Sequence, residues 1–327
     1  MPPTIVYVHG ISNQPPKDLL KLAWDDALLG RSAGSGSVMA YWADLRYPTP
    51  AGAPDAAGPG GLEGVPGAGD VEVAGDPFFA PEELVAETLA EVAAERAAAE
   101  PGLEGMGGAG APAVPELDDR LNSWLVEMAY AADAAERGDA EEAAGSGPAE
   151  LGPGAGDLEA LPLPRPARTA VFRALVKRAF ADVYAYFFGG QGEAIKQRMR
   201  DALAAAGPGP LIVIGHSLGS VIAYDVLRES GPARDIPLFV TIGSPLAVTE
   251  IQDLVARPLL VPAGVRQWRN AADGRDLVAL DKTIRPEFAP PDLTIDFLVD
   301  NTSTSHHGGI QYLESAPVKS AVAALLG

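Results

Sequence analysis

The sequence predicts an α/β fold in which a mostly parallel sheet carries helices on both faces. Short apolar runs alternate with longer segments of helical periodicity in residues 1–43 and 167–327. Runs such as "IVYV" and "LIVIG" are almost continuously apolar, which is typical of parallel strands that are buried on both faces. The chain has 327 residues, 47% of them hydrophobic, so it is long and apolar enough to bury a sizeable core.

The predicted elements follow one another in strand–helix order. The strands are expected at 4–10, 37–43, 210–215, 236–244, 265–274 and 292–301. The helices are expected at 15–30, 167–188, 192–207, 218–230 and over most of 308–327. Ser12 or Asn13 is expected near the cap of the first helix and Gly30 at its end, while "FFGGQGEA" indicates a helix break. Functional groups in such sheets gather on loops at the carboxyl ends of the strands.

Residues 44–166 are predicted to form an insertion into this core. Residues 51–165 hold 24 Asp and Glu but 4 Lys and Arg, whereas the rest of the chain holds 20 of each kind. Runs of Gly, Ala and Pro at 51–76, 101–116 and 143–160 are too poor in large apolar side chains to form a core. Between them, 81–100 and 117–139 have amphipathic helical faces, which favour a helical hairpin on the core or a lid over a substrate site.

Composition excludes several classes of protein and site. The balanced charge outside the insertion offers no basic face for nucleic acid. The absence of cysteine excludes disulfides, thiolate catalysis and thiolate metal sites. No apolar run reaches 18 residues, so no membrane-spanning helix is expected, and "MPPTIVYVHG" lacks the basic and apolar regions of a signal peptide. The expected location is therefore the cytoplasm.

The segment "VIGHSLGSVIAYD" at 213–225 predicts a nucleophilic serine. Ser217 lies between Gly215 and Gly219, directly after a predicted strand and directly before a predicted helix. A sharp strand–turn–helix bend crowds the neighbours of its apex, so glycine is needed at both positions, and the apex side chain is held above the sheet. The positive end of the helix points at the apex, which lets the Leu218 amide donate to an oxyanion.

A serine hydroxyl needs a base, and the base needs an orienting acid. Among four histidines, "TSHHGGIQYL" places His306 and His307 on a loop after the last predicted strand, whereas His9 ends the first strand and His216 is expected to point away from the apex. The chain order Ser…Asp…His calls for an acid between them. The segment "WRNAADGRDLVALD" supplies Asp273 and Asp276 as candidates.

The segments "IVYVHGI", "VIGHSLGS", "TIGSPL", "WRNAADGRDLV" and "HHGGIQYL", in this order, resemble the α/β-hydrolase superfamily, in particular its lipase-like and esterase-like serine hydrolases. The resemblance implies an α/β-hydrolase core over residues 1–43 and 167–327. It implies Ser217 as nucleophile, Asp276 as acid, His307 as base and Ile11 as the donor of a second oxyanion amide. The first strand begins the chain without the earlier strands of larger relatives, and residues 44–166 match nothing in the family.

The sequence thus predicts a serine hydrolase that cleaves carboxylic esters through a Ser-His-Asp triad and an acyl-enzyme, with no cofactor and no metal. The expected partner is a small ester with an apolar acyl group. An acyltransferase or thioesterase would use the same triad, and a binding or scaffold protein could keep the fold without turnover. The adjacent histidines could also ligate a metal with Asp296 or Asp300, although their spacing is not diagnostic.

Overall fold

The computed structural model describes residues 2–52, 169, 172–177, 180–229, 234–276, 278–279, 281–303 and 305–327. Most of the predicted insertion, including the helices expected at 81–100 and 117–139, lies outside the described residues. The domain boundaries and the lid therefore stay predictions.

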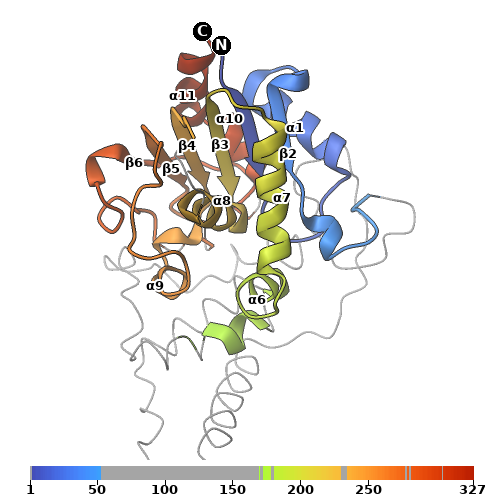
Figure 1. Cartoon of the computed structure of the whole chain (residues 1–327), viewed down its shortest axis with the longest axis vertical. Helices are drawn as coiled ribbons and strands as arrows, with labels where there is room; N and C mark the ends of the chain where they lie inside the picture. The colour runs from blue at the N-terminus through green and yellow to red at the C-terminus, as the bar shows by residue number, and fades with distance from the viewer. Residues whose placement is uncertain are drawn as a thin grey trace, which may run out of the picture.

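A six-stranded, all-parallel sheet forms the centre of the molecule, in agreement with the predicted α/β class (Figure 1). The strand order is β2-β1-β3-β4-β5-β6. The strands are β1 (Thr4–Val8), β2 (Ser37–Ala40), β3 (Leu211–His216), β4 (Leu238–Ile242), β5 (Trp268–Ala272) and β6 (Thr294–Leu298). Each predicted strand is thus present. Strand β3 has the predicted length and is shifted by one residue, whereas the other five are shorter than their apolar runs because the ends of the runs enter loops.

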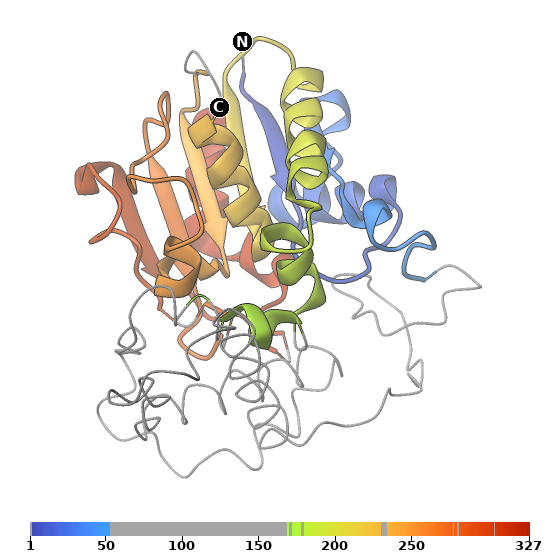
Figure 2. The same ribbon diagram turned by 60° about the horizontal axis from the view of Figure 1, so that its bottom comes forward.

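Helices cover both faces of the sheet (Figures 1 and 2). On one face lie α7 (Gly192–Ala205) and α8 (Leu218–Glu229), and on the other lie α1 (Lys17–Leu29), α10 (Gly309–Glu314) and α11 (Ala316–Leu326). The short helices α6 (Ala181–Phe187) and α9 (Thr249–Gln252) lie beyond the carboxyl ends of the strands. Side chains that alternate along a strand feed two separate cores. In β1, Val6 and Val8 pack in the core that includes α7 and α8, whereas Ile5 and Tyr7 pack with α1, α10 and α11.

Three helix boundaries differ from the sequence prediction. The helix expected over 167–188 is broken at Phe180, whose non-helical φ of −138° and ψ of 70° precede the first residue of α6. The first helix begins at Lys17 with Pro16 as its N-cap and without a side-chain cap, so neither Ser12 nor Asn13, which were expected near the cap, caps the helix. Gly30 does end that helix in the left-handed region, with φ of 67°. The C-terminal segment forms two helices, separated at Ser315.

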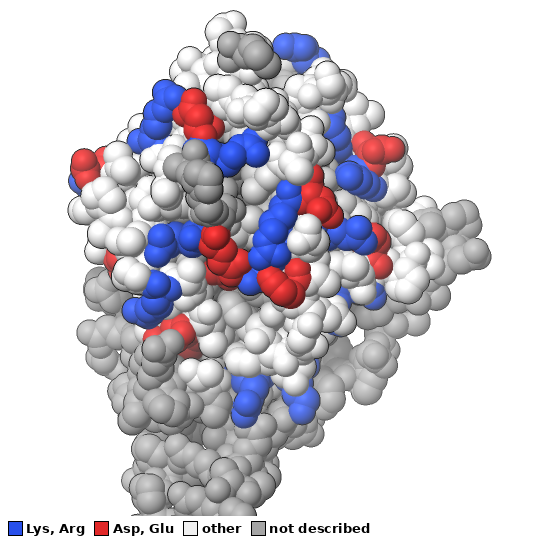
Figure 3. All heavy atoms as spheres, viewed as in Figure 1, with Lys and Arg blue, Asp and Glu red and all other residues white. Residues whose placement is uncertain are grey.

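The surface over α7 and α8 mixes acidic and basic side chains (Figure 3). Lys196 and Arg200 of α7 both pair with Glu229 at the end of α8, for example. This agrees with the balanced charge expected of the core. Within the described part of the chain, none of the helices combines the length and the hydropathy needed to cross a bilayer.

Candidate active site

Ser217 lies at the sharp turn between β3 and α8. Its φ of 50° is in the left-handed region, which non-glycine residues rarely adopt. The two flanking glycines are required by close packing: a Cβ at Gly215 would lie 2.6 Å from Cα of Ser220, and one at Gly219 would lie 2.3 Å from the carbonyl oxygen of Val8. The G-x-S-x-G pattern is thus explained by backbone contacts around a strained serine.

Asp276 and His307 form a buried hydrogen-bonded pair at the carboxyl ends of the strands. Nδ1 of His307 lies 2.8 Å from Oδ2 of Asp276, on the loops that follow β5 and β6. The other carboxylate oxygen, Oδ1, accepts from the amides of Val278 at 2.9 Å and Ala279 at 3.2 Å, and the Tyr312 hydroxyl donates to Oδ2 at 2.6 Å. Burial raises the pKa of Asp276, but the charge and hydrogen bonds of its partners outweigh burial and lower that pKa to about 2. Asp276 is therefore ionised at neutral pH and able to orient His307.

The two alternative residues from the sequence lie in other contacts. Asp273 accepts from the amides of Arg275 at 2.7 Å and Asn301 at 2.5 Å, and its carboxylate pairs with the Arg275 side chain. His306 has a φ of 54°, and its Nδ1 lies 2.9 Å from the carbonyl oxygen of Asn301. The structure therefore brings together Asp276 and His307, and it places Asp273 and His306 in the turns that support them.

His216 joins the serine turn to the histidine loop. The His307 carbonyl can only accept, so Nε2 of His216 donates to it, at 2.7 Å. The two imidazole rings lie 4.7 Å apart between centroids. Burial, followed by the charge of His307, lowers the pKa of His216 to about 3, so it stays neutral. His216 is thus turned toward the loop of the base, a contact that the sequence analysis did not foresee.

Gly10 brings the loop after β1 against the same turn. A Cβ at Gly10 would lie 2.9 Å from both the Cβ of Ser217 and Nδ1 of His216. The backbone that continues to Ile11 therefore passes close to Ser217, and Leu218 begins α8 directly after Ser217. These are the two places from which the predicted oxyanion amides would donate.

Two buried side chains hold the loop after β1 in place. His9 accepts from the amide of Trp42 through Nε2 at 3.0 Å, so its other nitrogen, Nδ1, donates to the Gly10 carbonyl at 2.9 Å. Asp182 accepts from the amide of Ser12 at 2.7 Å. The same carboxylate also binds Arg46 Nε at 2.9 Å and the hydroxyl of Tyr47 at 3.0 Å. We call Asp182 with these three partners the Asp182 clamp.

Gly243, directly after β4, packs against Asp276 and His307. Its φ is 53°, and a Cβ there would lie 3.0 Å from Oδ2 of Asp276, 3.0 Å from Cε1 of His307 and 2.9 Å from the Tyr312 ring. Gly243 and Tyr312 belong to the segments "TIGSPL" and "HHGGIQYL" of the resemblance, but neither residue was expected in the site. Nothing in the spacing of these residues reveals that they meet at Asp276.

The described residues include no group of three or more His, Asp or Glu side chains that could hold a metal ion. The two acids of the metal alternative have other partners. Asp296 accepts from Asn270 Nδ2 and from the Ile284 amide, both at 3.0 Å. Asp300 pairs with Arg275.

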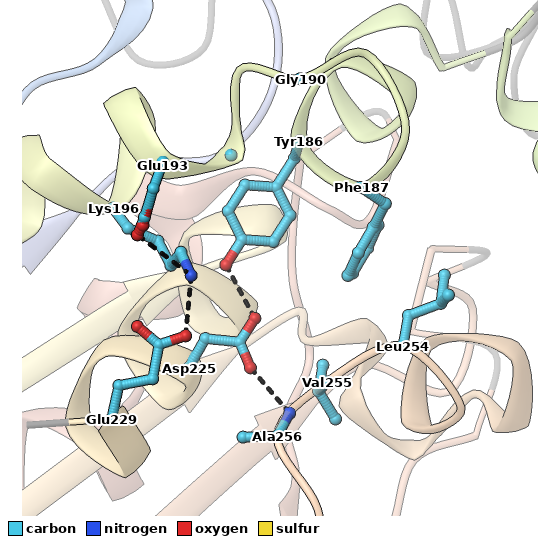
Figure 4. Close-up of a pocket in the computed structure, with 11 residues that line it drawn as sticks. Tyr186, Phe187, Gly190, Glu193, Lys196, Asp225, Glu229, Leu254, Val255 and Ala256 are labelled. Carbon is cyan, nitrogen blue, oxygen red and sulfur yellow. Dashed lines mark hydrogen bonds and ion pairs between the residues drawn. The ribbon is translucent and has the colours of Figure 1, made fainter.

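A separate pocket of about 490 Å³ opens between α6, α7, α8 and the segment after α9 (Figure 4). Its lining contains none of the proposed catalytic residues. Tyr186 donates to Oδ2 of Asp225 at 2.7 Å, and the Ala256 amide donates to Oδ1 at 3.0 Å. Lys196 lies between Glu193 and Glu229. The polar groups of this pocket thus pair largely with one another.

Comparison with protein-family models, with curated proteins and with solved structures found no match in any of the three searches. Only the residues and their geometry therefore indicate the function of this chain.

Proposed function

We propose that this chain is a serine hydrolase of the α/β-hydrolase type that cleaves carboxylic esters with Ser217, His307 and Asp276. The observation that carries the proposal is the 2.8 Å bond between His307 and Asp276, on loops packed against the strained Ser217 turn. Nucleophile, base and acid follow β3, β6 and β5, so all three lie at the carboxyl ends of the strands, where this architecture gathers functional groups.

The reaction begins when His307 accepts the hydroxyl proton of Ser217 as its oxygen attacks the ester carbonyl carbon. The carbonyl electrons move to the oxygen, and the amides of Leu218 and Ile11 donate to the resulting oxyanion. Asp276 remains ionised and stabilises the imidazolium. When the oxyanion collapses, the ester C–O bond breaks and the alcohol leaves with the proton from His307.

The second half of the reaction hydrolyses the acyl-enzyme. His307 accepts a proton from water as the water oxygen attacks the acyl carbonyl, and it then returns a proton to Ser217 as the acid product leaves. No cofactor takes part in these steps. The apolar faces at 84–92 and 117–132 in the sequence favour an apolar acyl group, and 44–166 is the proposed lid over it.

A fluorophosphonate probe tests the proposal directly, because its phosphorus forms a bond to the oxygen of an activated serine (phosphonylation) as fluoride leaves. The wild type is expected to be labelled, and Ser217→Ala is expected to remain unlabelled. With an ester substrate, Ser217→Ala should lower kcat by about a millionfold, as in other triad enzymes. Near wild-type turnover in a folded Ser217→Ala protein would contradict the assignment. A panel of esters of increasing acyl length then measures the preferred substrate.

A further inference from the structure

Tyr312 is a buried α10 residue whose hydroxyl reaches the acid of the proposed triad. Its side chain is fully buried, and its ring packs over Gly243. The hydroxyl lies 2.6 Å from Oδ2 of Asp276, the same oxygen that accepts from His307. Two donors thus converge on a single carboxylate oxygen, one from α10 and one from the loop before it.

The direction of the Tyr312 hydrogen bond is fixed by a second contact. The amide of Asp273 donates to the Tyr312 oxygen at 2.9 Å, so the phenol is an acceptor there and its only proton points to Asp276. Burial, followed by the charge of Asp276, raises the pKa of Tyr312 well above its ordinary value. The phenol is therefore protonated throughout the neutral range and always donates.

We propose that Tyr312 is a positioning residue that sets both the orientation and the basicity of Asp276 toward His307. This inference rests on the proposed function, because it concerns the base of that reaction. A hydrogen bond to an ionised carboxylate stabilises its charge and makes it a weaker proton acceptor. With Tyr312 in place, Asp276 orients His307 through one hydrogen bond. The weakened carboxylate raises the pKa of His307 less than it would without the Tyr312 hydroxyl.

Tyr312→Phe removes the hydroxyl and keeps the ring. Asp276 then keeps the His307 bond and its two amide donors, becomes more basic and favours protonated His307, which cannot accept the Ser217 proton. The acidic limb of the rate-against-pH profile for fluorophosphonate labelling is expected to move up by about one pH unit, which corresponds to a tenfold change in the protonation equilibrium. If Tyr312 served only the stability of the fold, Tyr312→Phe would lower the labelled fraction or Tm and would leave the acidic limb at the wild-type pH.

The chain supplies a matched control in Tyr186→Phe. Tyr186 also donates to a buried carboxylate, at 2.7 Å to Asp225, but lies in the separate pocket (Figure 4). This variant should keep the wild-type limb. His216 and Lys282 also interact electrostatically with Asp276, and both remain in every variant compared, so the difference isolates the hydroxyl of Tyr312.

A second substitution covers the case in which Tyr312→Phe does not fold. Placing 3-fluorotyrosine at position 312 keeps the hydroxyl and makes it a stronger donor, so the acidic limb should move to lower pH. If the acidic limb stays at the wild-type pH in the folded variants while labelling still requires Ser217, the proposed role of Tyr312 is wrong and the proposed function stands. Labelling that persists in Ser217→Ala would overturn the proposed function and this inference together.

Discussion

Lowering the pH from 7 to 5 should destabilise the protein through two buried histidines, His9 and His216. Neither side chain is exposed to solvent. Burial lowers the pKa of His9 to about 4 and is the main cause that lowers the pKa of His216 to about 3, whereas an exposed histidine in the unfolded chain has a pKa of about 6.5. Below that value the unfolded state binds protons that the folded state does not, so stability falls as the pH falls.

The expected loss follows from these pKa values. Integrating proton binding from pH 7 to pH 5 gives about 2 kcal/mol for each histidine, or about 4 kcal/mol for both. A typical domain is stable by about 5–15 kcal/mol, so this is a large fraction of the total. Burial raises the pKa of Asp225 and Glu287, and these carboxyls act in the opposite direction because they bind protons in the folded state.

His9→Gln isolates one histidine from these other groups. The glutamine oxygen can accept from the Trp42 amide in place of Nε2, and it does not titrate in this range. Urea unfolding at pH 7 and pH 5 should show that the variant loses about 2 kcal/mol less than the wild type between the two pH values. The comparison uses the change with pH, so a lower stability of the variant at pH 7 does not affect it. An equal pH-dependent loss in both proteins would refute the argument.

Two further predictions concern the geometry of the site. Gly243→Ala should lower the rate of fluorophosphonate labelling by about 100-fold, because the added Cβ would displace Asp276 and His307 and a shift of about 1 Å lowers the rate by that factor. Gly190→Ala is the control for backbone strain, because Gly190 has a φ of 73° and open space where the Cβ would lie. This control variant should be labelled at the wild-type rate. His306→Asn should keep labelling within a few-fold of wild type, whereas His307→Asn should nearly abolish it; the reverse order would assign the base to His306.

Features that depend on short stretches of sequence could be predicted. The apolar runs located all six strands, and the Ser217 turn followed from two glycines between a strand and a helix. Gly30 was recognisable as a helix end because glycine adopts the left-handed conformation at little cost. In each case the physical cause lies within about ten residues of the feature.

Features that depend on contacts between distant segments could not be predicted from local sequence. Asp273 and Asp276 share one loop, and only the path of that loop decides which carboxylate faces His307. Tyr312 lies 36 residues from Asp276 in the chain, and its α10 position alone gives no sign of the contact. The break at Phe180 was missed because the apolar periodicity continues through it, although the backbone does not.

The Asp182 clamp joins residues that are 135 and 136 positions apart, Tyr47 and Arg46 on one side and Asp182 on the other. Two segments that are distant in the sequence, one with Arg46 and Tyr47 and the other with Asp182, are therefore held together next to the Ser12 amide. The shape of the loop that carries Ile11 then does not depend on how many residues separate Tyr47 from Asp182. A change in the length of that stretch is therefore expected to leave the loop after β1 in place, because the clamp holds the Ser12 amide from both sides.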